Sequence, residues 1–398
     1  MKKIFDLQER SNFKSGIKVK LSGECLKELP FKGDTGEALV VADDDGYRII
    51  PLKRDVKKLY IEPTTKCNFQ CITCIRSSWE DELSHMSWET FKNIADTLSL
   101  FPDLEWVHFG GFGEPFSHPE IFKMLQLVKE SGYKVEIITN GSFLTDTTID
   151  RLIDLKIDMV YTSLDAPDKE EYDRIRQGAD FTSVLKNVKS LVERKSSFKS
   201  TLPQLGVEFV AMKSNFHRLP ELIKLCRDLN VRKVIVTNLL PYHESMLDQV
   251  LYDMDDTVNP FGNDSPLSMM IAQFPYMKLR TYRYCKFVED KALCINHKGD
   301  VSPCYALMHS YSCYVYGRKK EIAHYKLGNV NEKSLAEIWT EPEYVNLRQA
   351  LKNFRFPSCP DCKYLEGCSM TESNEMDCWG NSPSCAECLW SRQLIACP

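Results

Sequence analysis

Three closely spaced cysteines are the feature that most constrains this chain. Cys67, Cys71 and Cys74 follow the pattern C-x3-C-x2-C. Tightly spaced cysteine runs are typical of iron–sulfur sites, and a closed four-iron cluster takes four thiolates. A run of three leaves one iron open to a small chelating ligand, which indicates chemistry rather than a purely structural site. The alternative is a zinc site made from two of these thiols and distant ligands.

The cysteines come directly after residues 58–62, a short apolar stretch that predicts a β-strand. They are therefore expected on the loop at the carboxyl end of that strand, where α/β barrels hold their active sites. Further along lies the sequence Gly-Phe-Gly-Glu-Pro, at residues 111–115. Glycine allows a backbone to approach a ligand closely, so this glycine segment is expected to form one edge of a binding site.

Strand-like and helix-like segments alternate through the middle of the chain. Apolar residues recur at helical spacing over residues 91–98 behind Ser87, and over residues 121–128 before Gly132. Strands that alternate with helices of this length predict a parallel sheet. Six strands are too few to close an eight-stranded barrel, so we expect an α/β fold with a partial (β/α)6 barrel. The strands are predicted at residues 59–62, 106–109, 134–139, 159–164, 206–212 and 233–238.

Composition excludes several classes of protein. The chain has 398 residues, of which 43% are hydrophobic and 27% charged, and this predicts a globular protein of two or three domains. A net charge of −5 gives no basic footprint for nucleic acid. Charges interrupt the first ten residues, and no apolar run approaches the roughly 20 residues that span a bilayer. We therefore expect a cytoplasmic protein that engages no membrane.

The cysteine run resembles the signature of the radical S-adenosylmethionine (SAM) enzymes. There, three thiolates hold a 4Fe-4S cluster and SAM chelates the open iron, so the resemblance gives these roles to Cys67, Cys71 and Cys74. Thr73 departs from the pattern, because the residue before the last cysteine is usually aromatic. The glycine segment resembles the family's Gly-Gly-Glu-Pro motif with one residue inserted. The SAM-binding residues implied are Gly111, Gly113, Glu114, Pro115, Thr139, Asn140, Ser163, Asp165 and Arg176. For Arg176, a solvated position on a helix is the alternative.

The C-terminal third is a second cysteine-rich region, because eleven of the sixteen cysteines fall after Tyr284. Their spacing resembles the SPASM domain of radical SAM maturases, which carries two auxiliary 4Fe-4S clusters. The pattern departs after Cys368, where the next cysteine follows nine residues later instead of three. By resemblance, Cys285, Cys294, Cys304 and Cys378 hold auxiliary cluster I. Cys359, Cys362 and Cys368 hold auxiliary cluster II with one of Cys385, Cys388 or Cys397. A pair of zinc ribbons is the alternative.

Three regions follow from these patterns. Residues 1–56 are an N-terminal region without an assigned role, in which a β-hairpin is predicted over residues 36–51 with its turn at Asp45-Gly46. Residues 57–284 form the expected radical SAM core. Residues 285–398 form the expected SPASM domain with its two auxiliary clusters.

Finer similarity points to a subgroup. The sequences at residues 67–76, 110–115 and 378–390, followed by Cys397-Pro398, look like the tungsten-cofactor oxidoreductase maturases, in which the threonine at position 73 is usual. The resemblance implies three 4Fe-4S clusters, SAM, and a low-potential electron donor such as ferredoxin. It also implies reductive cleavage of SAM to a 5′-deoxyadenosyl radical. Hydrogen abstraction would then modify a tungstopterin cofactor or the tungsten-dependent aldehyde oxidoreductase that carries it.

Two other functions remain open at this point. One is a SPASM maturase that acts on a peptide or protein side chain, and the other is a non-enzymatic iron–sulfur electron-transfer scaffold. No catalytic acid or base is predicted, because His108 and His118 beside the glycine segment are equally consistent with structural roles. Tyr242 and His243 are candidates for the substrate side.

Overall fold

The computed structural model describes residues 17–20, 37–43, 46–79, 81–254, 272–273 and 282–398. Its strands are β1 (Ile17–Lys20), β2 (Glu37–Asp43), β3 (Gly46–Pro51), β4 (Lys58–Ile61), β5 (Trp106–Phe109), β6 (Lys134–Thr139), β7 (Met159–Ser163), β8 (Gln204–Ala211), β9 (Lys233–Asn238), β10 (Ala272–Gln273), β11 (Ala292–Ile295), β12 (Asp300–Ser302), β13 (Tyr311–Val315), β14 (Arg318–Ile322) and β15 (Gly328–Asn329). Its α-helices are α2 (Trp88–Ala95), α3 (Ile121–Glu130), α4 (Asp146–Asp154), α5 (Lys169–Ile175), α6 (Phe181–Ser197), α7 (Leu219–Asp228), α8 (Lys286–Glu289), α9 (Leu335–Trp339) and α10 (Pro342–Lys352). Short 3₁₀ helices include η4 (Pro115–Ser117) and η8 (Tyr305–Leu307).

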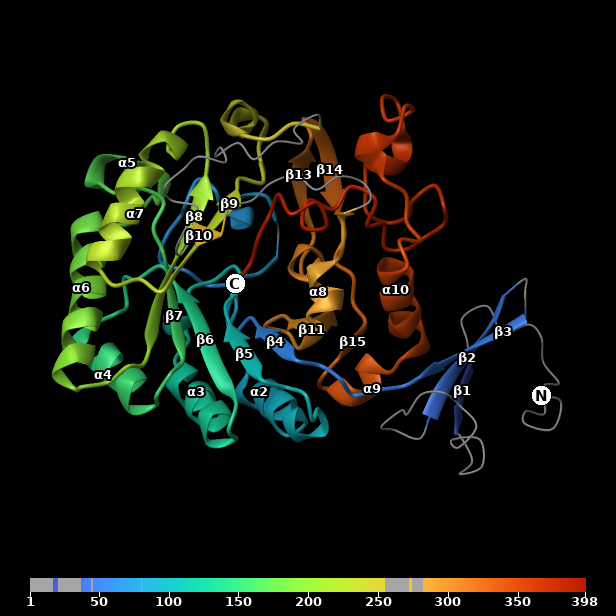
Figure 1. Ribbon diagram of the computed structural model, residues 1–398, viewed down its shortest axis with the longest axis horizontal. Coiled ribbons are helices and arrows are strands. Elements are labelled where there is room, and N and C mark those ends of the chain that lie inside the picture. Colours follow the sequence, from blue (N-terminus) through green and yellow to red (C-terminus); the bar gives the residue numbers. More distant parts are fainter. Residues whose placement is uncertain (1–16, 21–36, 44–45, 80, 255–271, 274–281) are drawn as a thin grey trace.

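The central sheet has the order β10-β9-β8-β7-β6-β5-β4-β11-β12-β15. Strands β4 to β9 are the six predicted strands, and they pair in parallel in chain order. The helices lie outside this curved sheet (Figure 1). The partial barrel predicted from the sequence is therefore confirmed.

Helices α2 and α3 have the expected local causes. The Ser87 side chain accepts a hydrogen bond from the backbone N–H of Thr90 and caps α2. Gly132 follows the end of α3 at φ +89°, a conformation that glycine adopts without strain. Both helices bury their apolar stripes against the sheet, with Phe91 and Met124 fully buried.

Two parallel strands that the sequence patterns did not predict flank the six. The two-residue strand β10 pairs with β9, and β11 pairs with β4 on the other side. Strand β11 belongs to the C-terminal third, so this region continues the sheet of the barrel instead of forming a separate layer. The consequence is that residues after β4 and residues after β11 lie next to each other.

The N-terminal sheet has three antiparallel strands, one more than the predicted hairpin. Asp43 pairs with Gly46, and the residues between them lie outside the described part of the chain. Leu39 and Val41 pack against Val345 of α10. This sheet lies beside α9 and α10, at the far end of the molecule from α6 (Figure 1), and its role stays unassigned.

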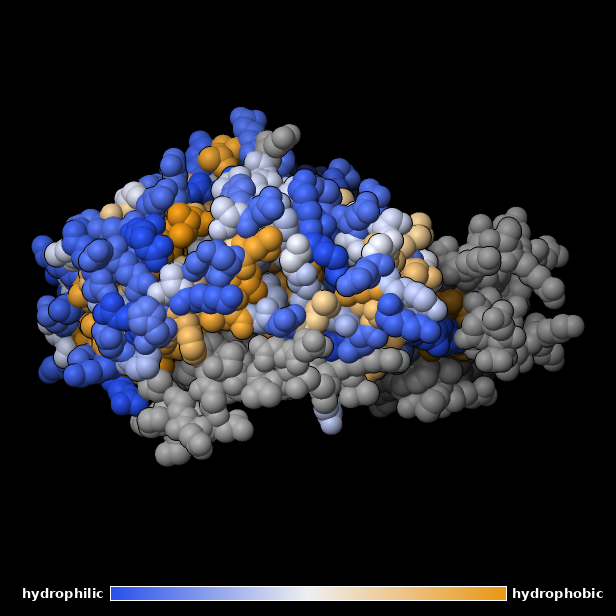
Figure 2. All heavy atoms as spheres, turned by 90° about the horizontal axis from the view of Figure 1, so that it is seen from above, coloured by the Kyte–Doolittle hydropathy of each residue, from blue (hydrophilic) through white to orange (hydrophobic). Residues whose placement is uncertain are grey.

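Hydrophilic side chains cover much of the visible outer face, with smaller hydrophobic patches between them (Figure 2). Among the described residues, no helix is long and apolar enough to cross a membrane.

Candidate active site

The loops at the carboxyl ends of the parallel strands enclose a central cavity of about 260 Å³. The three cysteines arrive on the loop after β4, the glycine segment after β5, and further polar residues after β6 and β7. Parallel strands bring these ends to one edge of the sheet, which explains why residues so distant in sequence meet. Of the predicted site residues, the cavity is lined by Cys67, Cys71, Cys74, Gly111, Gly113, Glu114, Thr139, Asn140, Ser163 and Arg176.

Hydrogen-bond donors point at the sulfurs of two of these cysteines. The backbone nitrogen of Phe69 lies 3.4 Å from Cys67 Sγ, and Asn140 Nδ2 lies 3.6 Å from it. Arg176 Nη1 lies 3.9 Å from Cys71 Sγ. Burial raises the pKa of the Cys71 thiol to about 11, although Arg176 lowers it. Partly buried cysteines whose sulfurs face donors fit an iron–sulfur cluster, whose iron binds thiolates and whose sulfurs accept hydrogen bonds.

The glycine segment packs directly on the stretch that leads into the cysteines. A Cβ atom added to Gly113 would lie 2.2 Å from the carbonyl oxygen of Thr64 and 2.7 Å from that of Lys66. The backbone N–H of Glu114 donates to the same Lys66 carbonyl at 2.8 Å. Glycine at position 113 is therefore required for the two loops to touch.

Glu114 joins this segment to the loop after β6. Its carboxylate accepts hydrogen bonds from Thr139 Oγ1 at 2.8 Å, the backbone of Asn140 at 2.7 Å and the backbone of Phe116 at 3.2 Å. Burial raises the pKa of Glu114 to about 7, whereas these donors lower it. Glu114 thus fixes the shape of the cavity wall, and the adjacent Pro115 begins η4 outside the cavity lining.

Arg176 and Asp165 form a buried ion pair beside the cysteines. Arg176 Nη2 lies 2.8 Å from Asp165 Oδ2, and the other carboxylate oxygen accepts from the backbone of Val210 at 2.8 Å. Arg176 caps the end of α5 and lines the cavity, so it is not a solvated helix residue. Asp165 does not line the cavity, and its place is behind Arg176, which it positions.

A layer of polar side chains inside the barrel was not predicted as part of the site. Tyr60 is in register with His108 on the next strand, and His108 with Glu136 on the strand after that. His108 Nδ1 lies 2.9 Å from Glu136, while its Nε2 has no partner among the described residues and the ring lines the cavity. Burial lowers the pKa of His108, and Glu136 raises it. The sequence does carry one signal for this layer: a polar residue stands within each otherwise apolar strand, and side chains at alternate positions of a strand share one face.

His118 has a structural role. Its Nε2 contacts the carbonyl oxygen of Met86 at 2.8 Å, and its Nδ1 accepts from the backbone of Glu120 at 3.1 Å. Both ring nitrogens are therefore engaged with the backbone.

The C-terminal end of the described chain reaches the middle of the molecule (Figure 1), where Cys397 and Pro398 line the cavity. Asn238 Nδ2 donates to the carbonyl oxygen of Leu394 at 3.0 Å, and the Tyr60 hydroxyl donates to that of Pro398 at 2.6 Å. Cys397 lines the cavity and accepts from Trp390 Nε1 at 3.2 Å. Tyr242, Tyr305 and Glu208 also line the cavity.

The cysteines of the C-terminal third lie in two groups. In the first, burial raises the pKa of Cys304, and the nearby thiols of Cys388, Cys285 and Cys385 raise it further. Cys304, Cys385 and Cys388 line one small cavity. Cys294 packs in one apolar cluster with Cys285, Cys304 and Cys397.

The second group lies around Cys359. Burial raises the pKa of Cys359 to about 12, and the nearby thiols of Cys378 and Cys368 raise it further. Cys378 is exposed. Cys378 is thus found near Cys359, and Cys385 and Cys388 are found near Cys304. The expectation that Cys378 completes the set of Cys285, Cys294 and Cys304 stays a prediction.

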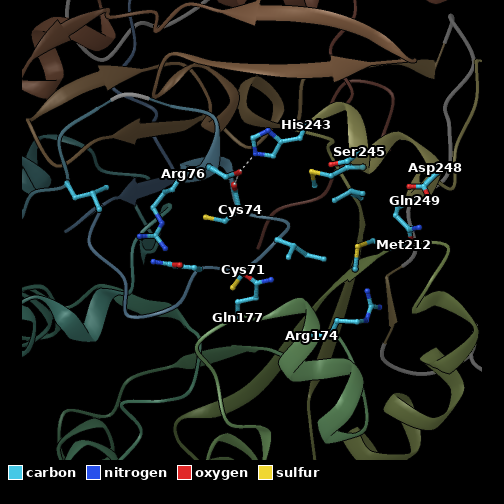
Figure 3. A pocket seen from close by; sticks show the side chains of 16 residues that line it. Cys71, Cys74, Arg76, Arg174, Gln177, Met212, His243, Ser245, Asp248 and Gln249 are labelled. Atoms are coloured by element: carbon cyan, nitrogen blue, oxygen red, sulfur yellow. Dashed lines mark hydrogen bonds between the residues drawn. The ribbon is translucent and has the colours of Figure 1, made fainter.

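An outer cleft of about 770 Å³ borders the cysteine loop (Figure 3). Cys71 and Cys74 line both this cleft and the central cavity. Arg76 and His243 also line the cleft, and His243 Nε2 lies 2.8 Å from Ser77 Oγ. The cysteine loop therefore borders both the central cavity and the outer cleft.

Comparison with known families agrees with this geometry. Residues 61–208 match the radical SAM superfamily, and residues 285–363 match the SPASM iron-sulfur cluster-binding domain. The chain belongs to the radical SAM/SPASM maturases, enzymes that bind iron–sulfur clusters and SAM.

Relatives narrow this class. The chain is 38% identical over 348 residues to the tungsten-containing aldehyde ferredoxin oxidoreductase cofactor-modifying protein of Pyrococcus furiosus, covering 86% of this chain and 97% of that protein. It is 23% identical to the Fe-coproporphyrin III synthase of Methanosarcina barkeri, covering 85% and 90%. The structure of Streptococcus suis SuiB bound to S-adenosylmethionine shares the fold, with a TM-score of 0.57 and 19% identity over 80% of this chain and 73% of that one.

Proposed function

We propose that this chain modifies the tungsten-containing cofactor of an aldehyde ferredoxin oxidoreductase, or the oxidoreductase that carries it, by SAM-dependent hydrogen abstraction. When bound, a reduced four-iron cluster and SAM supply a 5′-deoxyadenosyl radical that takes a hydrogen atom from the substrate. The 38% identity to a cofactor-modifying protein along nearly its whole length supports this substrate.

The observation that carries the proposal is the shared cavity. The three thiols, the glycine segment and Arg176 line it together with His108, Tyr242, Tyr305 and Cys397. SAM bound along the glycine segment would leave the residues of the C-terminal third that line the cavity for contact with a substrate. The chain's own residues then orient both molecules and exclude water, while the cofactors supply the chemistry.

We further propose three four-iron clusters in the holoenzyme. Cys67, Cys71 and Cys74 hold the first. For the auxiliary clusters we propose that Cys359, Cys362, Cys368 and Cys378 form one ligand set, and that the ligands of the other come from the group of Cys285, Cys294, Cys304, Cys385, Cys388 and Cys397. A low-potential donor such as ferredoxin supplies the electron, and the outer cleft supports this partner because it reaches Cys71 and Cys74 from outside.

The test is turnover by the anaerobically reconstituted chain. With SAM and dithionite, it is expected to form 5′-deoxyadenosine, and the triple variant Cys67→Ala/Cys71→Ala/Cys74→Ala is expected to form none. Cys226→Ala is the matched control, because Cys226 is a buried thiol on the core-facing side of α7. Absence of 5′-deoxyadenosine from the wild type contradicts the enzymatic proposal.

The substrate needs a second measurement. Isolated tungstopterin cofactor and the tungsten-dependent oxidoreductase are each incubated with the reconstituted chain and SAM. A mass change in the cofactor that depends on SAM is expected. A SAM-dependent change confined to a protein side chain would instead assign the chain to the maturases that modify peptides or proteins.

A further inference from the structure

A buried group of metal-ligand side chains lies outside the cysteine sites. Glu62 follows β4 and His297 follows β11, two strands that pair in parallel with Ile61 opposite Ile295. His309 comes shortly after η8. Their exposed fractions are 0%, 3% and 1%. The fold therefore brings a carboxylate and two imidazoles together in the interior, at the junction of the barrel and the C-terminal third.

The distances between the ligand atoms suit a single ion. One ligand atom from each residue lies within 4.8 Å of the others. Glu62 Oε2 is 2.8 Å from His309 Nε2 and 3.4 Å from His297 Nδ1. Nitrogen and oxygen ligands of zinc lie at about 2.1 Å, so neighbouring ligand atoms of a tetrahedral site are about 3.4 Å apart. The separations from Glu62 Oε2 to the two imidazole nitrogens are thus close to those between ligand atoms around one ion.

Neighbouring groups form hydrogen bonds with these side chains, as is usual around metal ligands. The second nitrogen of His309, Nδ1, lies 3.1 Å from Asp81 Oδ2. The second oxygen of Glu62, Oε1, accepts from the backbone of Phe112 at 3.0 Å. Histidine ligands typically donate their other N–H to a carboxylate, which fixes the tautomer and the ring orientation.

A hydrogen-bonded network without a metal explains His297 poorly. Its Nδ1 makes only the 3.4 Å contact with Glu62, and its Nε2 has no partner among the described residues. A polar ring that is buried with one long contact costs free energy. A metal ion between the three side chains would give that Nδ1 a bond of full strength.

We propose that Glu62, His297 and His309 bind one divalent transition metal ion, with Asp81 positioning His309. Two imidazoles and one carboxylate are a donor set typical of zinc and of ferrous iron. The ion is separate from the iron–sulfur clusters. Because Glu62 also holds Phe112, and a Cβ atom on Gly111 would lie 2.5 Å from the Glu62 side chain, the ion fixes the glycine segment.

The test uses zinc and the reconstituted full chain. The chain is treated with a chelator that leaves iron in place, given one equivalent of zinc, and examined by metal analysis and zinc X-ray absorption. We expect about one zinc per chain, with nitrogen and oxygen ligands at about 2.0 Å and no sulfur at about 2.3 Å. Zinc binds such sites more tightly than ferrous iron, so a chain that binds no zinc there overturns the proposal for either metal.

Variants test which of these residues bind the ion. Asp81→Asn is expected to fold, because Asp81 is on the surface side with a third of its side chain exposed, and to weaken zinc affinity roughly 10- to 100-fold. Glu62→Gln and His309→Ala are expected to abolish it. The control His217→Asn removes an exposed histidine and is expected to bind zinc as the wild type does.

Iron content is measured in every variant, so that loss of folding is distinguished from loss of the ion. Zinc with a sulfur shell, or an Asp81→Asn variant that binds zinc as tightly as the wild type, overturns the proposal.

Discussion

Arg176 and Asp165 are buried together at the carboxyl end of the parallel strands, and each depends on the other. Taking a charge out of water costs several kcal/mol, and this cost is offset only by a partner of opposite sign. Arg176 has a second contact, with Cys71 Sγ, so the ion pair also sets the charge beside the cysteine loop. This single residue links the stability of the barrel to the environment of the expected cluster.

Arg176→Gln is expected to lower the free energy of unfolding by about 3–5 kcal/mol, because Asp165 is left buried without a counter-ion. Arg174→Gln is the matched control, since that side chain is 53% exposed and its ion pair with Glu171 is long, at 3.7 Å. We expect it to change stability by no more than about 0.5 kcal/mol. Anaerobic urea denaturation of the reconstituted proteins measures both, and equal losses would contradict the buried-pair interpretation.

Single residues show what sequence could and could not predict. The three cysteines lie close together in the sequence, so their spacing alone was sufficient to predict an iron–sulfur site. His108 lies three residues before Gly111, the nearest predicted site residue. A polar residue in an apolar strand does not by itself distinguish a ring that lines a site from a structural one. The unpartnered nitrogen of His108 becomes visible only when the register of three strands is known.

At the scale of elements, the loops after β4 and β5 form one unit. The glycine segment accepts no side chain at position 113 because two carbonyl oxygens of the preceding loop occupy that space. The contact sets the distance between the cysteines and the backbone edge expected to bind SAM.

Gly113→Ala is expected to push the two loops apart, with a cost of about 1–3 kcal/mol in stability and a weaker SAM affinity measured by equilibrium dialysis. Gly132→Ala is the control, because an added Cβ atom there meets nothing within 4 Å and only the positive φ opposes it. Its cost is expected at about 1–2 kcal/mol, without a change in SAM affinity. Unchanged SAM affinity in Gly113→Ala would show that SAM binding does not depend on the contact between the two loops.

The elements also show where periodicity is informative. Strands β4 to β9 were predicted because each is an apolar run between turn residues and amphipathic helices. Strand β10 has two residues, too few for any pattern. Strand β11 is apolar, but nothing local indicates that it pairs with β4, which lies more than two hundred residues earlier in the chain.

At the scale of the whole molecule, the grouping of the auxiliary cysteines can be tested by counting iron. Under the proposed ligand sets, Cys359→Ser/Cys378→Ser removes ligands from one cluster and is expected to lose about four of about twelve irons per chain. Cys304→Ser/Cys378→Ser removes one thiol from each group and, with Cys304 as a ligand of the other cluster, is expected to lose about eight. If the first variant loses about eight irons and the second about four, Cys378 belongs to the same ligand set as Cys304.

The wild-type count is the reference for this experiment. About twelve irons per chain fit three four-iron clusters, and about four would leave the C-terminal cysteines without clusters. Spacing could not settle the grouping, because it records distance along the chain and says nothing of which loops fold back together.

Strand β4 has β5 on one side and β11 on the other, and this has a consequence for inheritance. A gene cut between the two regions would give a barrel whose β4 presents an open row of backbone donors and acceptors, and such edges recruit other chains and aggregate. Recombination between relatives is therefore expected to transmit β4 through β15 as one block, and a chimaera joined at Cys285 requires a β11 whose side chains match the β4 of its new host.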